Sequence, residues 1–209
     1  MYLILHVVEP EVEKTRRAPY GINPSILNRW SPRSFTGEEI SDSSLYALFE
    51  AARWAPSSYN NQPWRFIYSK RGSKYWDLLF DLLVDFNKQW CANASVLVVI
   101  LSHKIFEHNG KPSPTHQFDT GAAWENLAIQ ATSQGLATHP MQGFDYEKAR
   151  KDLDVPGDYE VVAMIAIGKK GPKENLSDEL KKREVPSDRK PLSEIVMEGK
   201  FGNKIGTPT

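Results

Sequence analysis

Two uninterrupted apolar runs constrain the fold of this chain more than any other feature of its sequence. Residues 96–101 and 161–167 contain only apolar side chains, many of them β-branched. A strand with one solvated face alternates apolar and polar residues, whereas a run without alternation is typical of a strand buried on both faces. We therefore expect both segments to be central strands that are covered on both sides.

Periodic patterns predict the other elements of the domain. Ser41 is a suitable N-cap for a helix over 42–54, in which apolar residues recur at i, i+3, i+4 and i+7. Aromatic residues occupy every second position over 64–69, at Trp64, Phe66 and Tyr68, and indicate a half-buried strand. The remaining expected elements are short helices over 24–30 and 146–153, helices over 73–87 and 118–134, a flexible loop or lid over 104–115, and a turn-rich connection over 135–145.

The two ends of the chain differ in composition from the middle. The tract from Glu9 to Arg17 is charged, and we interpret it as an arm that can move. From Lys169 onward about forty residues are polar and contain one small apolar cluster, which is too little to fold alone. We expect this tail to wrap the domain or a partner subunit. The predicted division is an N-terminal arm over 1–23, a domain over 24–170 and a C-terminal extension over 171–209.

Charge and cysteine content argue against several classes of protein. Lysine and arginine (26) balance aspartate and glutamate (26), so no net charge attracts nucleic acid or an anionic membrane. A single cysteine, Cys91, excludes an internal disulfide and beside an apolar run reads as a buried structural thiol. The first eight residues are too short for a signal segment, and no other run is long enough to span a bilayer. We expect a cytoplasmic protein.

The loop over 56–64 carries more polar side chains than a plain connection needs. Its sequence is PSSYNNQPW, and proline, serine and asparagine together force the chain to leave the preceding helix and turn. Four small hydrogen-bonding side chains within six residues suit a planar ligand that is rich in heteroatoms. An ordinary polar loop is the alternative interpretation.

Three residues just past the short helix at 24–30 could form an anion site. Arg29, Ser31 and Arg33 supply two guanidinium groups and a hydroxyl that can converge on a phosphate. A basic helix terminus is an equally good interpretation, since arginine favours the last turn. Arg189, in the tail, is a further candidate, although the sequence alone favours an exposed basic residue without a function.

Motifs that supply an acid, a base, a nucleophile or a metal are missing. The sequence contains no GxSxG, HExxH, CxxC, P-loop or GxGxxG pattern, and its five histidines lack metal-ligand spacing. A chain of this kind that is nevertheless an enzyme is expected to use a bound cofactor for the chemistry.

Four motifs, taken together and in order, resemble the FMN-dependent nitroreductase family of NAD(P)H-dependent flavin oxidoreductases. They are RxSxRxF at 29–35, PSSxNxQPW at 56–64, HPMQGFD at 139–145 and SDRKPLSEIV at 187–196, so the resemblance extends from about residue 24 to residue 197. It implies an α+β sandwich in which helices cover both faces of a central mixed β-sheet. It also implies an intertwined homodimer with a C-terminal arm and with FMN at the subunit interface.

The resemblance assigns FMN contacts to three parts of the chain. Arg29, Ser31 and Arg189 would hold the phosphate, and Arg33 would lie by the pyrimidine edge of the flavin. Trp30 lies among them at a position where the family varies. The residues that would reach the flavin from the partner subunit are Pro56, Ser57, Ser58, Asn60 and Gln62.

The resemblance places the reactive side of the flavin near residues 140–143. The Gln142–Gly143 peptide would put a backbone N–H near flavin N5, and Pro140 and Met141 would pack on the ring face. Asn87 would be a further ring contact, and Trp90 stands where some members carry a lysine beside the flavin.

The implied mechanism is ping-pong. NAD(P)H gives a hydride to flavin N5 and leaves, and an electron-poor acceptor (nitroaromatic, quinone or enone) is then reduced at the same place. No side chain is nominated as acid, base or nucleophile. The alternatives are a specialised relative, such as a reductive dehalogenase, a flavin-fragmenting enzyme or an azoline oxidase, and a flavin-binding protein without activity in which Trp30 or Trp90 obstructs the flavin.

Overall fold

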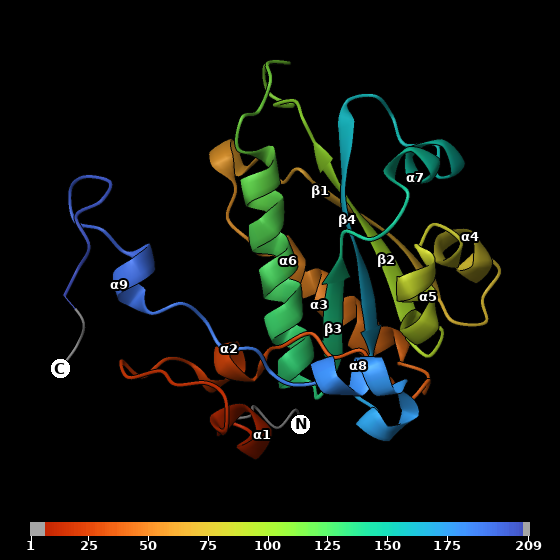
Figure 1. Cartoon of the computed structure of the whole chain (residues 1–209). Helices are drawn as coiled ribbons and strands as arrows, with labels where there is room; N and C mark the ends of the chain where they lie inside the picture. The colour runs from red at the N-terminus through yellow and green to blue at the C-terminus, as the bar shows by residue number, and fades with distance from the viewer. Residues whose placement is uncertain (1–6, 207–209) are drawn as a thin grey trace.

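The computed structural model describes residues 7–206 and has one four-stranded sheet in the order β1-β2-β4-β3 (Figure 1). The predicted central runs are β2 (Val96–His103) and β4 (Tyr159–Gly168), which pair with each other in the middle of the sheet. The outer strands are β1 (Trp64–Lys70), as expected, and β3 (Ala137–Met141). The α+β class is confirmed. Every neighbouring pair is antiparallel, however, so the sheet of one chain is not the mixed sheet that the resemblance implied.

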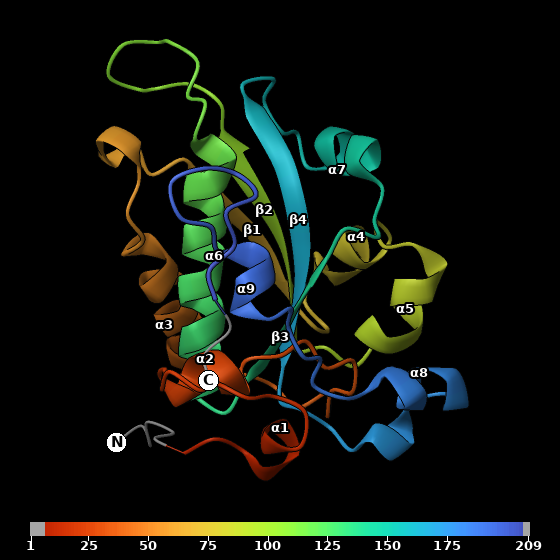
Figure 2. The ribbon, with the colours of Figure 1, turned by 60° about the vertical axis from the view of Figure 1, so that its left-hand side comes forward.

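Helices cover both faces of the sheet, which explains why β2 and β4 show no polar alternation. On one side lie α3 (Asp42–Arg53) and α6 (His116–Ser133), and on the other lie α4 (Trp76–Phe80), α5 (Asp85–Cys91) and α7 (Tyr146–Asp152) (Figure 2). Val98 faces the first group and Val99 the second, and both are fully buried. Successive strand residues point to opposite faces, so both faces of β2 need apolar side chains.

The predicted N-caps form the expected contacts. The Ser41 hydroxyl accepts a hydrogen bond from the Ser44 N–H at 3.2 Å and begins α3. The Asn23 side chain accepts one from Ser25 at 2.9 Å and begins α2 (Pro24–Asn28), whose Pro24 needs no donor at this position. Helix α2 lies against the C-terminal half of α6 (Figure 1).

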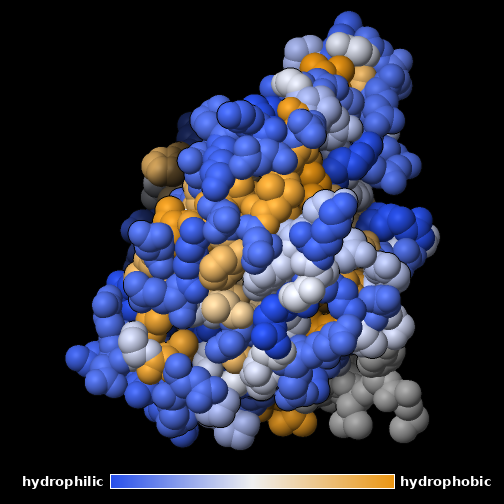
Figure 3. Space-filling view, turned by 90° about the vertical axis from the view of Figure 1, so that its right-hand side faces the viewer, coloured by the Kyte–Doolittle hydropathy of each residue, from blue (hydrophilic) through white to orange (hydrophobic). Residues whose placement is uncertain are grey.

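The helix expected over 73–87 is wrong as a single element, because the chain forms α4 and α5 with a break between them. Val84 has an extended backbone, and its N–H donates to the Gly143 carbonyl at 3.1 Å. Leu83 forms an isolated β-bridge with Phe144. Hydrogen bonds to another part of the chain therefore override a helical apolar pattern. The face that carries α4, α5 and α7 is mostly hydrophilic, with apolar side chains near its middle (Figure 3).

The connection expected over 135–145 contains a strand that the sequence did not reveal. Residues 137–141 pair with β4, although Pro140 lies among them. Proline is tolerated on an edge strand because its missing N–H can face away from the neighbour. No other described strand pairs with the outer edge of β3.

The C-terminal extension begins on the domain and then leaves it. After η2 (Lys173–Asn175), α8 (Asp178–Arg183) buries Leu180 against the core. Beyond it the chain runs outward past α6 to α9 (Leu192–Ile195), and Phe201 is 97% exposed (Figure 1). In the part of the chain that the structure describes, no helix combines the length and the apolar character needed to cross a membrane.

The N-terminal arm is packed against the domain. It contains α1 (Pro10–Glu13), in which Val12 has no exposed surface, and Arg16 is only 8% exposed. The tract from Glu9 to Arg17 was expected to be able to move, because its charges look solvated in the sequence. In the structure one apolar and one charged side chain fix it to the fold.

Candidate functional site

A cavity of about 420 Å³ brings together residues from distant parts of the sequence. It lies between the segment that follows α2, strand β3 and the segment that follows α8. We refer to it as the arginine cavity. Its lining residues are Arg16, Arg29, Trp30, Ser31, Arg33, His139, Arg183, Val185, Ser187 and Arg189. The three residues nominated for the phosphate, Arg29, Ser31 and Arg189, are all among them, as are Arg33, nominated for the pyrimidine edge, and Trp30.

The backbone conformation after α2 sets the positions of Arg29, Ser31 and Arg33. Helix α2 ends at Asn28 because Arg29 takes an extended conformation, and the Ser31–Pro32 step continues it. The Arg29 side chain is 14% exposed; its Nη1 lies 3.4 Å from the Ser31 hydroxyl and its Nε 3.9 Å from a Glu125 carboxylate oxygen. The segment that follows is fixed by Glu184, which accepts hydrogen bonds from the backbone N–H groups of Arg33 and Ser34 at 2.9 Å each.

The cavity carries an excess of positive charge. Burial is the main cause that lowers the pKa of Arg16 and of Arg29, and the nearby Arg189 lowers both further. Glu125 opposes the shift of Arg29. The buried Nε of Arg33 has no hydrogen-bond partner among the described residues. Clustered guanidinium groups and an unpaired buried donor suit a bound anion such as a phosphate, which would satisfy both.

His139 forms the wall of the cavity on the β3 side and is neutral. Burial lowers its pKa to about 4, with a smaller contribution from Arg33. Its Nδ1 lies 2.9 Å from the Pro32 carbonyl oxygen, which can only accept, so the proton is on Nδ1. Trp90 lies on the core side of His139, with 4.5 Å between the two ring centroids, and is 3% exposed. Trp90 therefore does not line the cavity, and its indole N–H is a second buried donor without a partner in the described chain.

The edge of β3 continues from the arginine cavity to the Gln142–Gly143 peptide. The Gly143 carbonyl accepts hydrogen bonds from the Val84 N–H at 3.1 Å and from Asn87 Nδ2 at 3.0 Å. A Cβ on Gly143 would lie 2.6 Å from that same nitrogen, so a larger residue would displace the Asn87 amide. The side-chain amide of Asn87 thus fixes the Gly143–Phe144 peptide, which directly follows the Gln142–Gly143 peptide, from inside the protein.

Two nominated ring contacts face the core in this structure. The Met141 side chain is 6% exposed, and its sulfur lies 3.4 Å from the Cys91 thiol. Asn87 is 9% exposed and is engaged with Gly143. Cys91 is buried as expected, and burial raises the pKa of its thiol, which makes it a poor nucleophile. Pro140 and Gln142 are less buried than Met141.

The loop over 56–64 lies at a different place from the arginine cavity. It contains η1 (Ser58–Asn60) and borders a second cavity of about 490 Å³, which Asn60 and Gln62 line and Pro56, Ser57 and Ser58 do not. Tyr59, Asn60 and Gln62 have positive φ values of 52°, 52° and 46°. Such a strained backbone persists only where its surroundings hold it.

Residues that the sequence did not single out hold this loop. The Ser58 N–H donates to the buried carboxylate of Asp119 at 3.1 Å. Asn61 donates to the Ile105 carbonyl at 3.1 Å and accepts from the Glu107 N–H at 3.0 Å. The loop over 104–115, expected to be flexible, is thereby tied to the loop over 56–64, and it closes on itself through the Ile105–Pro112 bridge.

Sequence comparisons link the chain to one protein family. The sequence model of the Nitroreductase family matches residues 26–85 and 73–169. "Putative NADH dehydrogenase/NAD(P)H nitroreductase SCO7141" of Streptomyces coelicolor is 28% identical over 156 residues, which cover 65% of this chain and 76% of that protein. "Protein DrgA" of Synechocystis is 31% identical over 149 residues, which cover 59% of this chain and 71% of that protein.

Solved structures share the fold of this chain. A crystal structure described as "the oxidoreductase containing FMN" has a TM-score of 0.87 and 43% identity, covering 90% of this chain and 97% of its own. A nitroreductase family protein of Streptococcus pneumoniae has a TM-score of 0.66 over 81% of this chain and 96% of its own. At 20% identity, the second likeness concerns the fold alone.

Proposed function

This chain belongs to the nitroreductase family of oxidoreductases, and from that premise we propose that it uses FMN to pass a hydride from NAD(P)H to an electron-poor acceptor. The acceptor class is a nitroaromatic, a quinone or an enone, and donor and acceptor use the same place in turn. FMN would supply the redox chemistry when bound. The side chains of the protein would bind the cofactor and orient it.

The observation that carries this proposal is the excess of guanidinium groups in the arginine cavity. Arg29, Ser31 and Arg189 meet there, with Arg29 partly buried and the Arg33 Nε without a partner in the described chain. A phosphate would accept charge-assisted hydrogen bonds from these groups. The related oxidoreductase of 43% identity is described as containing FMN, which supports this ligand over other phosphates.

The remaining contacts follow the edge of β3. β3 ends at Met141, and the four residue steps from His139 to Gly143 span at most about 13 Å, so a ligand held by its phosphate can lie along this edge. Among the described residues the Gly143 N–H donates no hydrogen bond and is free for a ring nitrogen. Neutral His139 and the apolar Pro140 keep this side of the site free of charge. Because Met141 and Asn87 face the core, we assign them to positioning the β3 edge.

The separation of the loop over 56–64 from the arginine cavity supports a shared site in a homodimer. If this loop contacts FMN, the FMN it contacts is the one held by the partner subunit. The outward C-terminal extension, with Phe201 97% exposed, is a second feature that a partner would cover. Sedimentation of the FMN-loaded protein should give a dimer, and a stable FMN-loaded monomer would contradict the shared site.

Turnover with a nitroaromatic tests the acceptor class. We expect steady NAD(P)H oxidation that depends on the nitroaromatic, with parallel double-reciprocal lines when both substrates are varied. Reduction of bound FMN by NAD(P)H without turnover of nitroaromatics, quinones or enones would indicate a specialised relative. Bound FMN that dithionite reduces and neither nicotinamide reduces would indicate a binding protein without activity.

A further inference from the structure

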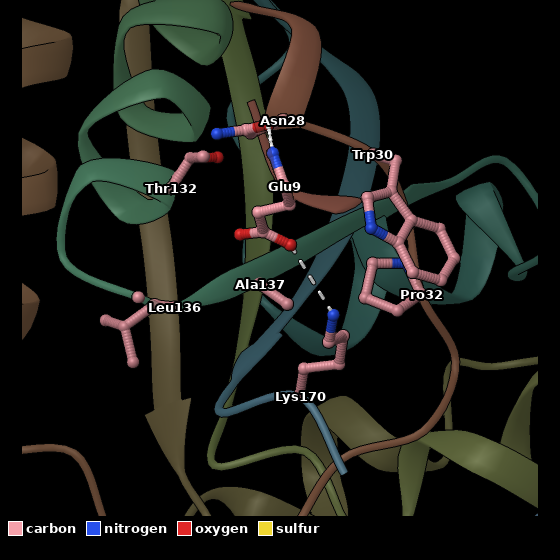
Figure 4. A pocket seen from close by; sticks show the side chains of 9 residues that line it. Glu9, Asn28, Trp30, Pro32, Thr132, Leu136, Ala137 and Lys170 are labelled. Carbon is pink, nitrogen blue, oxygen red and sulfur yellow. Dashed lines mark hydrogen bonds and ion pairs between the residues drawn. The ribbon is translucent and has the colours of Figure 1, made fainter. Parts of the chain in front are cut away.

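The N-terminal arm reaches the arginine cavity, although it precedes every motif that predicts the site. Its first attachment is at Glu9, whose N–H donates to Asn28 Oδ1 at 2.8 Å and whose carboxylate lies 3.7 Å from Lys170 Nζ (Figure 4). Asn28 also donates to the Val7 carbonyl at 2.9 Å. The cavity beside this attachment is about 70 Å³, too small for a cofactor. The described part of the arm is therefore attached to the domain at Val7 and Glu9.

Arg16 is the second attachment, and it joins three separate segments. Its Nε donates to the Ser187 carbonyl at 2.8 Å, and its Nη1 donates to the Arg29 carbonyl at 2.8 Å and to the Leu27 carbonyl. The carbonyls of Leu27 and Arg29 lie at the end of α2, where such groups lack intrahelical partners. One side chain of the arm thus connects the end of α2 to the segment that carries Arg189.

From this contact pattern we infer that Arg16 is a positioning residue for phosphate recognition. It holds the Arg29 segment and the Ser187–Arg189 segment at one cavity, so that both guanidinium groups can meet the same anion. Its Nη2 donates to none of the described residues, and Arg16 itself lines the cavity. Arg16 therefore also supplies a further cation. The inference rests on the proposed FMN phosphate site and adds a segment that no motif of the family includes.

The chemistry of the guanidinium group explains why an arginine stands at this position. Donors that point in several fixed directions are needed to reach three carbonyls, and a lysine ammonium on a flexible stem does not hold that geometry. The nearby Arg189 and Arg29 repel Arg16, Asp188 offsets part of this repulsion, and a bound anion would relieve it further. Anion binding should therefore stabilise the docked arm as well as the cavity.

The test compares FMN with riboflavin, which lacks the phosphate, in Arg16→Met and in a matched control. Arg17→Met removes the same charge from the next residue, which is exposed and lies outside the cavity. Among the described residues, the Arg17 side chain donates hydrogen bonds only to the carbonyls of Glu13 and Arg16. Flavin fluorescence quenching gives both dissociation constants. We expect Arg16→Met to weaken FMN binding roughly 10-fold or more and riboflavin binding less than twofold, and Arg17→Met to change neither by more than twofold.

A second readout is tryptic cleavage in the arm, at Lys14 and Arg17. FMN should slow this cleavage in the wild-type protein, and riboflavin should not. If Arg16→Met does not fold, Arg16→Lys provides the same test, because it keeps a charge and loses the three-carbonyl contact. We expect Arg16→Lys to bring the dissociation constants of FMN and riboflavin closer together than they are in the wild-type protein.

Three results would overturn the inference. An FMN-to-riboflavin preference unchanged in the folded Arg16 variants would show that Arg16 takes no part in phosphate recognition. An equal loss of affinity for FMN and for riboflavin would show that Arg16 has a general structural role instead. A wild-type protein that binds neither flavin would overturn the proposed function, and the inference with it, so the two failures are distinguishable.

Discussion

Replacing Arg29 with methionine should weaken FMN binding about 10- to 150-fold without unfolding the protein. Hydrogen bonds to charged groups contribute about 1.5–3 kcal/mol, and each 1.4 kcal/mol changes a dissociation constant tenfold. We expect Arg29 to contribute most to phosphate binding, because its side chain is 14% exposed and it lies beside the Ser31 hydroxyl. Flavin fluorescence quenching measures the effect directly.

The control for Arg29 is Arg53→Met. Arg53 is exposed on α3 and lies outside the arginine cavity; among the described residues its only ion pair is with Glu50, and it also lies over the Trp54 ring. Its loss removes the same net charge, so it reports any general electrostatic effect on flavin binding. Wild-type FMN affinity in the Arg29 variant would mean that the phosphate lies elsewhere. An equal loss in both variants would mean that the effect comes from the net charge of the protein.

His139 should make the protein sensitive to acid. In the folded state its pKa is lowered to about 4, mainly by burial, against an unfolded value of 6.5. The unfolded state therefore binds the proton first as the pH falls, and stability rises with pH in this window. The full contribution is present above pH 6.5 and is lost as the pH falls towards 4. The free energy of unfolding should decrease by about 3 kcal/mol over this range because of His139 alone.

Urea unfolding of the wild-type protein and of His139→Gln between pH 4 and 7 isolates this contribution. Glutamine can still donate a hydrogen bond to the Pro32 carbonyl and does not titrate. Subtracting the two pH profiles removes the effect of the carboxylates. The difference between the two free energies of unfolding should rise with pH near pH 5, with the slope expected for the uptake of about one proton on unfolding. Parallel profiles would show that His139 is already solvated or protonated in the folded state.

The parts of the fold that local patterns determine were predictable. The central position of β2 and β4 follows from runs without polar alternation, and the starts of α2 and α3 follow from the capping side chains of Asn23 and Ser41. The position of Arg29, Ser31, Arg33 and Arg189 in one cavity could not be predicted from their spacing in the sequence, because no local pattern brings residue 189 next to residue 29. That prediction came from the resemblance of four motifs to a known family.

The features that were missed depend on contacts between distant segments. Strand β3 has a proline in its middle and is a strand only because β4 offers a pairing edge. The break between α4 and α5 is set by the Gly143 carbonyl, more than fifty residues away. Arg16 lies in a tract whose charges suggest a solvated arm, and its role depends on carbonyls at residues 27, 29 and 187. No sequence pattern carries that information.

Flavin reduction is the most direct test of the proposed function. The absorbance spectrum of the purified, FMN-supplemented protein should be recorded without oxygen, before and after addition of NADPH and then NADH. The arginine cavity and the β3 edge predict a bound flavin band that bleaches with at least one of these donors. A protein that stays colourless after FMN is added and the excess removed would contradict the proposal that the arginine cavity holds the phosphate of FMN.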